Sequence, residues 1–347
     1  MSSGYEFGDL PESIEDEAAL EELLSRPPKW LCDKLGSLTG DIAVLGVGGK
    51  VGPTLARMAK RAVPDKTVIG VARFSDQDVR NRLDSWGVET VACDLLDREA
   101  VAGLPKAANV IYMAGKKFGT DDDPSFAWAM NTHVPATIAE TFRDSRIVAF
   151  STLCVYPFAP VAEGGFGEEV EPGPTGDYAT SCVGRERMFS YFSRKHGTPG
   201  RLARLNYAID MRYGVLHDIA GWVRDGTPIP IGTGYASVIW QGDAIAQILG
   251  ALAHTTVPTS PLNVGGPEHM SVIMAAREFG RRFGKEPVFE GDVQPDGWYN
   301  NTLAAQRFFG YPSVPLAVMI DWVADWMLRD MPSHDKPTHY EERRGGF

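Results

Sequence analysis

Cysteine, basic charge and long apolar runs are all scarce in this 347-residue sequence, and each shortage excludes a class of protein. The four cysteines, Cys32, Cys93, Cys154 and Cys182, form no C-x-x-C pair and have no metal-ligand spacing. We therefore expect free thiols in a reducing compartment, and no metal site. No apolar stretch reaches the roughly 18 residues that a membrane span needs. The polar, acidic first residues do not resemble a secretory signal, so the expected location is the cytoplasm.

Net charge and length further limit the expected binding partners and the domain organisation. The 34 basic residues against 45 acidic ones give a net charge of −11, which repels nucleic acid and anionic membranes, so we expect neither as a partner. A small anionic ligand is still compatible with this charge, because local basic side chains can override the global field. The length exceeds what one hydrophobic core usually serves, which indicates one large domain with a smaller lobe.

Apolar runs of strand length alternate with helical patterns from Asp41 onward. Continuous apolar strands between helices are typical of a parallel sheet that is covered on both faces. The fold class that we predict is therefore α/β, a doubly wound parallel Rossmann sheet with a smaller C-terminal substrate lobe. The expected strands are Ile42–Leu45, Val68–Val71, Val88–Val91, Val110–Met113, Ile147–Phe150, Arg201–Asn206 and Leu262–Val264, and the expected helices lie near 52–62, 76–86, 97–103, 124–143, 178–196, 271–284 and 315–328.

The first expected strand leads directly into a glycine-rich loop, Gly46-Val47-Gly48-Gly49-Lys50-Val51-Gly52. In such a loop one glycine makes the tight turn, one lets the backbone approach a pyrophosphate, and one lets the helix pack on the strand. The helix N-terminus then favours the anion. Because the loop opens a β-α-β series, it predicts NAD(P) binding.

The end of the second strand bears on the choice between NAD and NADP. NAD sites usually place an acid there, but this strand ends Val71-Ala72-Arg73-Phe74. Arg73, helped by Lys50, would pair with a 2′-phosphate through charge-assisted hydrogen bonds. The alternative is that both are solvated surface cations. The pattern slightly favours NADP over NAD.

These elements divide the chain into four predicted parts. Residues 1–40 form an N-terminal helical extension packed on the outside of the main domain, or, as an alternative, a dimer contact. Residues 41–206 form the NAD(P)-binding Rossmann domain. Residues 207–332 form a substrate-binding lobe, with segments that return to the Rossmann domain, and residues 333–347 form a polar tail.

Several ordered motifs over 41–330 resemble the extended short-chain dehydrogenase/reductase family, also called the NAD-dependent epimerase/dehydratase family. The resemblance implies that Asp94 and Leu95 contact adenine, and that Ala114, Gly115 and Lys116 lead to the nicotinamide side. It also implies that Asn131 belongs to the site and that Thr152 is the catalytic hydroxyl. The motifs are Cys93–Asp97, Val110–Gly115, Met130–Thr132, Ser151–Tyr156, Arg204–Tyr207, Gly242-Asp243 and Leu262–Gly266.

The family's catalytic tyrosine is followed four residues later by a lysine. Tyr191–Lys195 has this spacing, but it lies 39 residues after Thr152, near the expected helix end, so we do not assign it to the site. Tyr178 lies 26 residues after Thr152, close to the family spacing, and Cys182 stands where the lysine is expected. The resemblance then implies hydride transfer, with Tyr178 as general acid/base and position 182 at the cofactor.

The missing lysine raises a question about activity. A phenol of pKa near 10 disfavours its phenolate by roughly 4 kcal/mol at neutral pH, and a neutral thiol cannot offset that cost. Arg185, which lies seven residues after Tyr178 on the same helical stripe, and Lys116 or Lys117 are alternative sources of the cation. A dinucleotide-binding protein with weak or no redox turnover, a sensor or pseudoenzyme, is the second hypothesis.

The substrate class is indicated by two missing arginines. Family members that act on nucleotide sugars carry one before the Val-x-Asp motif, where this chain has Ala236, and another near Phe289–Asp292. We therefore favour a sugar, sugar acid or sugar lactone over a nucleotide sugar, which stays an alternative. The resemblance also implies a homodimer. Candidate lining residues of the substrate lobe are Arg212, His217, Trp222, Arg224 and Trp240.

Overall fold

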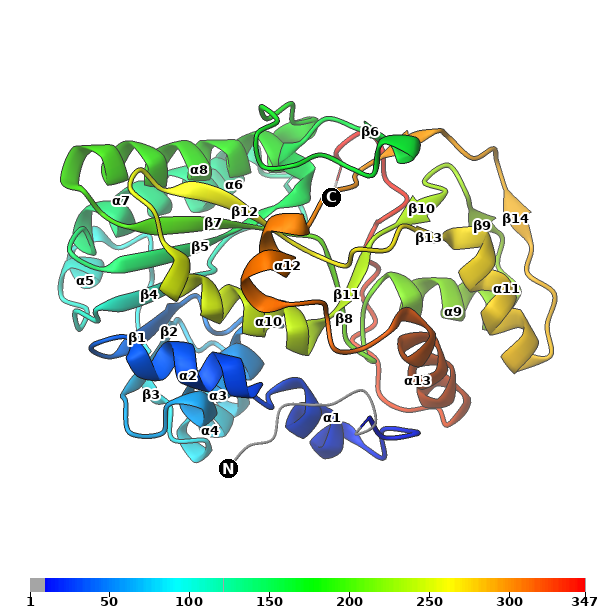
Figure 1. Cartoon of the computed structure of the whole chain (residues 1–347), viewed down its shortest axis with the longest axis horizontal. Helices are drawn as coiled ribbons and strands as arrows, with labels where there is room; N and C mark the ends of the chain where they lie inside the picture. Colours follow the sequence, from blue (N-terminus) through cyan, green and yellow to red (C-terminus); the bar gives the residue numbers. More distant parts are fainter. Residues whose placement is uncertain (1–9, 121, 347) are drawn as a thin grey trace.

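The computed structural model describes residues 10–120 and 122–346, and a seven-stranded parallel sheet is its centre (Figure 1). The strand order is β3-β2-β1-β4-β5-β7-β12, so the chain turns back at β1 and continues outward from β4. This order confirms the predicted doubly wound sheet. The strands are β1 (Ile42–Leu45), β2 (Val68–Ala72), β3 (Glu89–Ala92), β4 (Asn109–Tyr112), β5 (Arg146–Thr152), β7 (Gly200–Leu205) and β12 (Ser260–Val264).

Alternate side chains of each strand enter two separate apolar layers. Ile42 and Val44 pack with one set of helices, and Ala43 and Leu45 pack with the other, all at most 1% exposed. Burial of both faces explains why the strands are apolar throughout. One layer contains α2 (Lys29–Ser37), α3 (Gly52–Ala62), α4 (Gln77–Ser85), α10 (Gln241–Gly250) and α12 (Leu303–Phe309), and the other contains α5 (Arg98–Ala102), α7 (Val134–Thr141) and α8 (Gly176–His196).

The helix expected over 124–143 is interrupted. It consists of α6 (Pro124–Trp128), a π-helical turn over Ala129–His133, and α7, which has Pro135 in its first turn. Proline lacks the N–H that a continuous helix would need at that point. The wider turn contains Asn131, whose side chain is fully buried. A π-turn inside a helix often marks a functional site.

The second lobe has its own core, which is formed by three helices and short strand pairs. Strand β8 pairs in parallel with β11, β9 with β14, and β10 antiparallel with β13, while β15 pairs with β6 of the sheet-side loop. None of the described helices is long and apolar enough to cross a membrane. The elements are α9 (Val215–Asp225), α11 (Val272–Phe283), α13 (Leu316–Leu328), β6 (Ala159–Pro160), β8 (Tyr207–Ile209), β9 (Ile229–Pro230), β10 (Tyr235–Ala236), β11 (Val238–Trp240), β13 (Met270–Ser271), β14 (Phe289–Glu290) and β15 (Asp296–Gly297).

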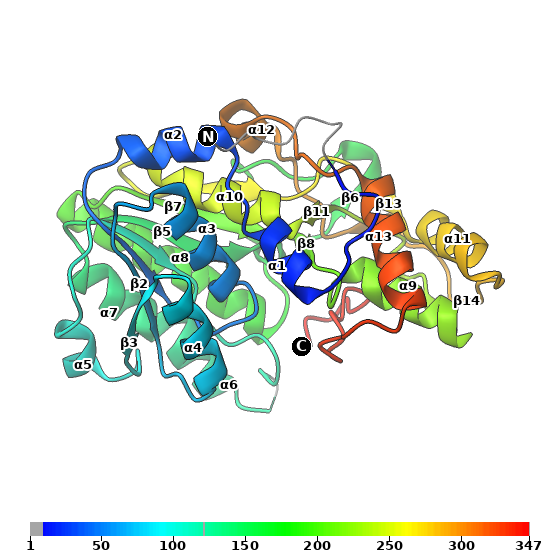
Figure 2. The ribbon, with the colours of Figure 1, turned by 90° about the horizontal axis from the view of Figure 1, so that it is seen from below.

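The N-terminal extension belongs to both lobes, which differs from the expected packing on the main domain alone. Helix α2 packs on the sheet layer, but α1 (Glu17–Leu24) lies beside α13 of the second lobe (Figure 1, Figure 2). Leu20 and Leu24 of α1 belong to the core of that lobe. The amphipathic pattern of α1 shows that it buries one face, but not which lobe covers that face. The extension therefore ties the two lobes together.

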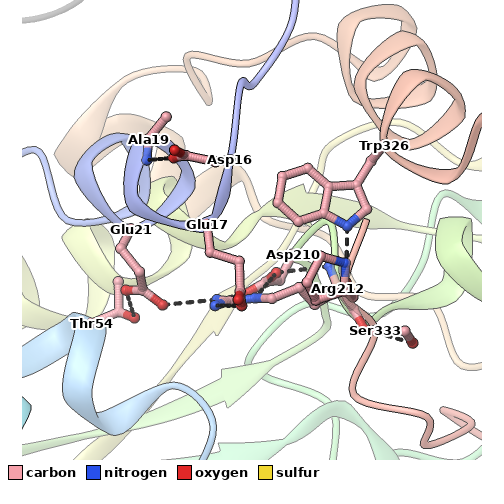
Figure 3. A network of polar contacts seen from close by, with 10 residues as sticks. Asp16, Glu17, Ala19, Glu21, Thr54, Asp210, Arg212, Trp326 and Ser333 are labelled. Carbon is pink, nitrogen blue, oxygen red and sulfur yellow. Dashed lines mark hydrogen bonds and ion pairs between the residues drawn. The ribbon is translucent and has the colours of Figure 1, made fainter. Parts of the chain in front are cut away.

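Arg212 is the polar centre of this tie (Figure 3). Its guanidinium donates two hydrogen bonds to Asp210, at 3.0 and 2.7 Å, and one of 2.9 Å to Glu21 of α1. The other carboxylate oxygen of Glu21 accepts 2.9 Å from the hydroxyl of Thr54 in α3. Arg212 is 6% exposed. It is therefore a structural ion-pair residue, and the expectation that it lines a substrate site is wrong.

The C-terminal residues 333–346 pack against the body of the protein, although their polar sequence predicts a tail. Tyr340 is fully buried against Trp222, and the backbone N–H and hydroxyl of Thr338 both donate to Asp218 of α9. Arg343 contacts Asp296 and lies over the ring of Phe158. This segment runs back toward the carboxyl edge of the sheet, and Thr338 lines a cavity there.

Candidate functional site

The glycine loop connects β1 to α3 at the carboxyl edge of the sheet. Gly46 has φ +93°, and a Cβ there would lie 2.6 Å from the backbone nitrogen of Ala114. A Cβ on Gly52 would clash with the carbonyl of Val47, so only glycine lets α3 pack this closely on the strand. Gly48 and Gly49 are exposed at the loop surface. The loop is therefore shaped for close approach of a ligand.

A cavity of about 370 Å³ opens beside this loop and contains most of the predicted cofactor residues. It lies at the point where the strand order reverses, which is where open α/β sheets bind nucleotides. Val51, by contrast, lines a second cavity, and Gly52 is buried beneath the loop. The predicted residues that line the first cavity are Gly46, Gly48, Gly49, Arg73, Asp94, Leu95, Ala114, Gly115 and Lys116.

Asp76 also lines this first cavity, although no motif of the sequence indicated it. It is the N-cap of α4, and its carboxylate accepts a 2.9 Å hydrogen bond from the backbone of Asp78. An acid was sought at the end of β2, but Asp76 lies four residues beyond Ala72, after Phe74 with its positive φ. The sequence signal that could have identified Asp76 is an Asp directly before a helical pattern, the usual position of a helix N-cap. Both an acid and Arg73 therefore face the same cavity.

The second cavity, of about 290 Å³, contains the predicted catalytic hydroxyls. Thr152 ends β5 and Tyr178 lies in the first turn of α8, so a strand end and a helix start bring them together. Both line this cavity, which shares Met113, Gly115 and Lys116 with the first one. The two cavities thus meet at the end of β4.

Tyr178 is hydrogen-bonded to Thr152 and also to Cys182. Burial and the neighbouring thiols of Cys182 and Cys154 hold the pKa of Tyr178 well above its usual range, and the positive charge of Arg185 opposes them. Burial raises the pKa of Cys182 to about 11, so this thiol is neutral. Cys182 is fully buried and packs with Val155 and Tyr156 behind Tyr178, and not at the cofactor cavity where the resemblance places it.

Asn131 joins the end of β4 to α8. Its amide oxygen accepts from the backbone N–H of Lys116 at 2.9 Å and from Arg185 at 2.7 Å. Its amide nitrogen donates to the carbonyl of Lys116 at 2.8 Å and to the hydroxyl of Ser181 at 3.0 Å. These bonds fix the backbone of Lys116 at the junction of the two cavities, so Asn131 is a positioning residue.

Arg185 is a cation whose charge acts on both Tyr178 and Cys182, the residue at the place of the missing lysine. Its side chain is 6% exposed, lines the second cavity, and donates 2.9 Å to the carbonyl of Phe150. Its described hydrogen-bond partners are neutral oxygens, so its positive charge acts on the tyrosine without being paired to a carboxylate.

Lys50 and Lys117 both line the second cavity as well. The ammonium group of Lys50 lies 3.2 Å from the ring centroid of Tyr213, in the second lobe. This placement overturns the expectation that Lys50 assists Arg73 at a 2′-phosphate. Lys117 donates to the carbonyl of Thr338 at 3.3 Å.

The other candidates of the substrate lobe lie away from this cavity. His217, Trp222 and Arg224 line a separate hollow on the outer side of α9, and Trp240 lines another near α2. Tyr191 lies on the surface with 51% exposure, and Lys195 is also exposed. From the second lobe, the residues that line the second cavity include Tyr207, Ala208, Tyr213, Gly214 and Val215. Of these, only Tyr207 belongs to a motif singled out in the sequence, Arg204–Tyr207.

No family model matches the sequence, and no curated protein matches it. Solved structures do match the fold. UDP-glucose 4-epimerase of Thermotoga maritima, solved with UDP-glucose, is 17% identical with a TM-score of 0.67, over 84% of this chain and 99% of that one. The dTDP-glucose 4,6-dehydratase of Bacillus anthracis, solved with NAD, is 16% identical with a TM-score of 0.71, over 84% and 97%. The dTDP-glucose 4,6-dehydratase of Streptomyces venezuelae, solved with NAD, is 18% identical with a TM-score of 0.70, also over 84% of this chain and 97% of that one.

The sheet order and the two joined cavities define a Rossmann-type protein with a second lobe. Within that class, the fold is that of the solved epimerase and dehydratase structures, which it matches over 84% of this chain. At this level of identity the likeness establishes the fold, which is the fold that the sequence motifs predicted.

Proposed function

We propose that this protein is an NAD(P)-dependent oxidoreductase or epimerase that acts on a sugar, sugar acid or sugar lactone. The observation that carries the proposal is the junction of the two cavities at Met113, Gly115 and Lys116. It places the Thr152–Tyr178 pair next to the end of the glycine-loop cavity. The similar structures with NAD, or with a nucleotide sugar, support this assignment.

The glycine-loop cavity fits a dinucleotide. Gly48 and Gly49 leave the loop surface open, and the first turn of α3 has no side-chain cap on its backbone N–H groups. These groups would hold the pyrophosphate. Asp94 and Leu95 would lie at the adenine end, and Ala114 and Gly115 at the nicotinamide end. When bound, the dinucleotide supplies or accepts the hydride.

Tyr178 and Thr152 would hold the reacting oxygen of the substrate between their hydroxyl groups. Because the pKa of Tyr178 is raised, its hydroxyl is protonated at neutral pH and acts as the proton donor. Reduction of a carbonyl needs such a donor: hydride adds to the carbon, and the phenolic proton goes to the oxygen. Arg185 then stabilises the phenolate that remains.

The preference for NADP over NAD is a separate part of the proposal. Arg73 would pair with a 2′-phosphate, whereas Asp76 in the same cavity would bond a ribose 2′-hydroxyl. We propose NADP, because Arg73 follows directly on β2. Titration calorimetry with both cofactors tests this, with Arg73→Gln as the variant. Weaker binding of NADP than of NAD by the unchanged protein would overturn the preference.

The catalytic assignment is tested by following absorbance at 340 nm with sugars, sugar acids and lactones. Tyr178→Phe should lower kcat by about 10²–10⁴-fold while cofactor affinity stays unchanged. Tyr191→Phe is the matched control, because Tyr191 lies on the same helix but is exposed on the surface. Full activity of Tyr178→Phe would refute the role of Tyr178.

A second candidate is a cofactor-binding protein without redox turnover. The two thiols against Tyr178 favour it, because neither supplies the charge that normally lowers the tyrosine pKa. Cofactor binding by calorimetry, together with no absorbance change on any compound of the panel, would support this candidate over the enzyme.

A further inference from the structure

Four basic side chains and no carboxylate line the catalytic cavity, although the whole chain carries a net charge of −11. We propose that this cavity takes a carbohydrate bearing an anionic group, a carboxylate or a phosphate ester, and that Lys50 and Lys117 bind that group. The inference deepens the proposed function and rests on it for the identity of the site as catalytic.

Lys50 reaches the cavity from the glycine loop. Its ammonium group lies over the ring of Tyr213 at 3.2 Å and 5.3 Å from the ring centroid of Phe118. No carboxylate of the described residues lies within ion-pair distance of it. A cation held on an aromatic face keeps its remaining donors available to a ligand.

Lys117 reaches the same place from the segment after β4. Its ammonium group lies 5.1 Å from the centroid of the same Phe118 ring and donates to the carbonyl of Thr338. The two lysines therefore flank one ring at one cavity wall. The charge of Lys117 lowers the pKa of Lys50, and Lys117 itself is bonded to Thr338 of the C-terminal segment.

Asp218 is an acid whose charge acts on both lysines, but it does not line the cavity. Its described side-chain hydrogen bonds both come from Thr338, at 2.8 and 2.6 Å. Within the cavity lining the basic side chains face no carboxylate, so an anionic ligand would meet a positive field there.

The cofactor is a less suitable partner for these lysines. The backbone of the glycine loop already provides the N–H groups for a pyrophosphate, and Arg73 lies at the other end of the first cavity. Lys50 instead points across to Tyr213 of the second lobe, and Lys117 to Thr338. Both contacts lie on the substrate side of the junction.

The test compares D-glucose with D-gluconate, D-glucuronate and D-glucose 6-phosphate as probes, by titration calorimetry with the intact protein and NADP present. We expect at least one anionic probe to bind tenfold or more tightly than glucose. The carboxylate and phosphate probes decide which anion the site takes. Lys50→Met and Lys117→Met should each lower the ratio of anionic-probe affinity to glucose affinity by about tenfold. Lys117→Arg should leave this ratio unchanged. Lys195→Met, a change of an exposed lysine outside the site, should have no effect.

Three results would overturn the inference: no anionic probe binds more tightly than glucose, both lysine variants keep the preference, or Lys50→Met weakens NADP binding and leaves the probes unaffected. A separate result concerns the proposed function. If anionic probes bind in a lysine-dependent way but no probe is oxidised or reduced, the anion site stands and the redox assignment fails. If neutral sugars turn over without an anion preference, the redox assignment stands and the anion site fails.

Discussion

The guanidinium of Arg185 donates a 2.7 Å hydrogen bond to the amide oxygen of Asn131, and this bond links α8 to the junction of the two cavities. The two residues lie 54 positions apart in the chain. The guanidinium also packs so closely on the backbone of Gly115 that a Cβ there would clash with it. One side chain thus carries the charge near Tyr178 and fixes the strand end where both cavities meet.

Replacing Arg185 should therefore affect chemistry more than binding. We expect Arg185→Met to lower kcat by about tenfold or more, because the phenolate of Tyr178 loses its stabilising charge, with KM changed much less. Steady-state kinetics across pH test this, since the pH at which oxidation becomes measurable should rise in the variant. Arg185→Lys should restore part of the rate. A lower melting temperature with unchanged kcat would assign Arg185 a purely structural role.

Restoring the family's lysine at position 182 should lower stability without raising activity. Cys182 is fully buried among Val155 and Tyr156, and Arg185 already lies beside it. Cys182→Lys would bury a second cation next to the first, at a cost of several kcal/mol in the free energy of unfolding. We expect a lower melting temperature and no gain in kcat, whereas Cys182→Ser should fold and turn over at a similar rate. A rise in kcat for Cys182→Lys would contradict this.

The sequence predicted the sheet well because its strands carry a strong local signal. The apolar runs at Ile42–Leu45 and Val68–Val71 match β1 and β2, the second with one further residue, and the glycine loop lies where the motif requires. The part of the chain after 207 was harder to predict, since α9 of the second lobe and α10 and α12 of the sheet layer lie among irregular segments and were not expected. The ends of α8 were predicted to within two residues, because Gly197 follows with a positive φ.

The candidate site shows where local pattern stops being informative. Helical spacing places Tyr178, Cys182 and Arg185 on one stripe, and this left Arg185 and two lysines as alternative cations. Which of them faces the tyrosine depends on Asn131 and Phe150, which approach from other elements. Likewise, Lys50 lies in the predicted glycine loop, but the direction of its side chain depends on Tyr213, more than 160 positions away in the chain. Tertiary contacts of this kind leave no trace in a single sequence.

The link between the lobes should contribute strongly to stability. Arg212 is paired with Asp210 and Glu21, whose side chains are 5% and 12% exposed. Arg212→Met would leave these carboxylates without their cation, which typically costs about 3–5 kcal/mol. Thermal and urea unfolding should show the loss, and exchanging the exposed Arg187→Met is the matched control. A change under about 1 kcal/mol would mean that the apolar packing of α1 alone joins the lobes.

Binding of an anionic probe should depend on pH through Lys50. Desolvation, with repulsion from Lys336 and Lys117, lowers the pKa of Lys50 to about 8, and the charges of Asp218 and Asp210 oppose this shift. Lys50 is therefore charged below pH 8 and neutral above it, so affinity for the anion should fall as pH rises through about 8 to 9.

The charge of Asp218 predicts how the affinity for an anion changes at acidic pH, and a Lys50→Arg variant is the control for both ends of the pH range. Below about pH 6 Asp218 gains a proton and loses its negative charge, so affinity should rise slightly. Lys50→Arg keeps its charge throughout, because a guanidinium is not deprotonated in this range, and its affinity should stay level where that of the unchanged protein falls. Calorimetry with D-gluconate, which stays ionised between pH 5.5 and about 9.5, measures both curves, and identical profiles for the two proteins would exclude Lys50 as the titrating group.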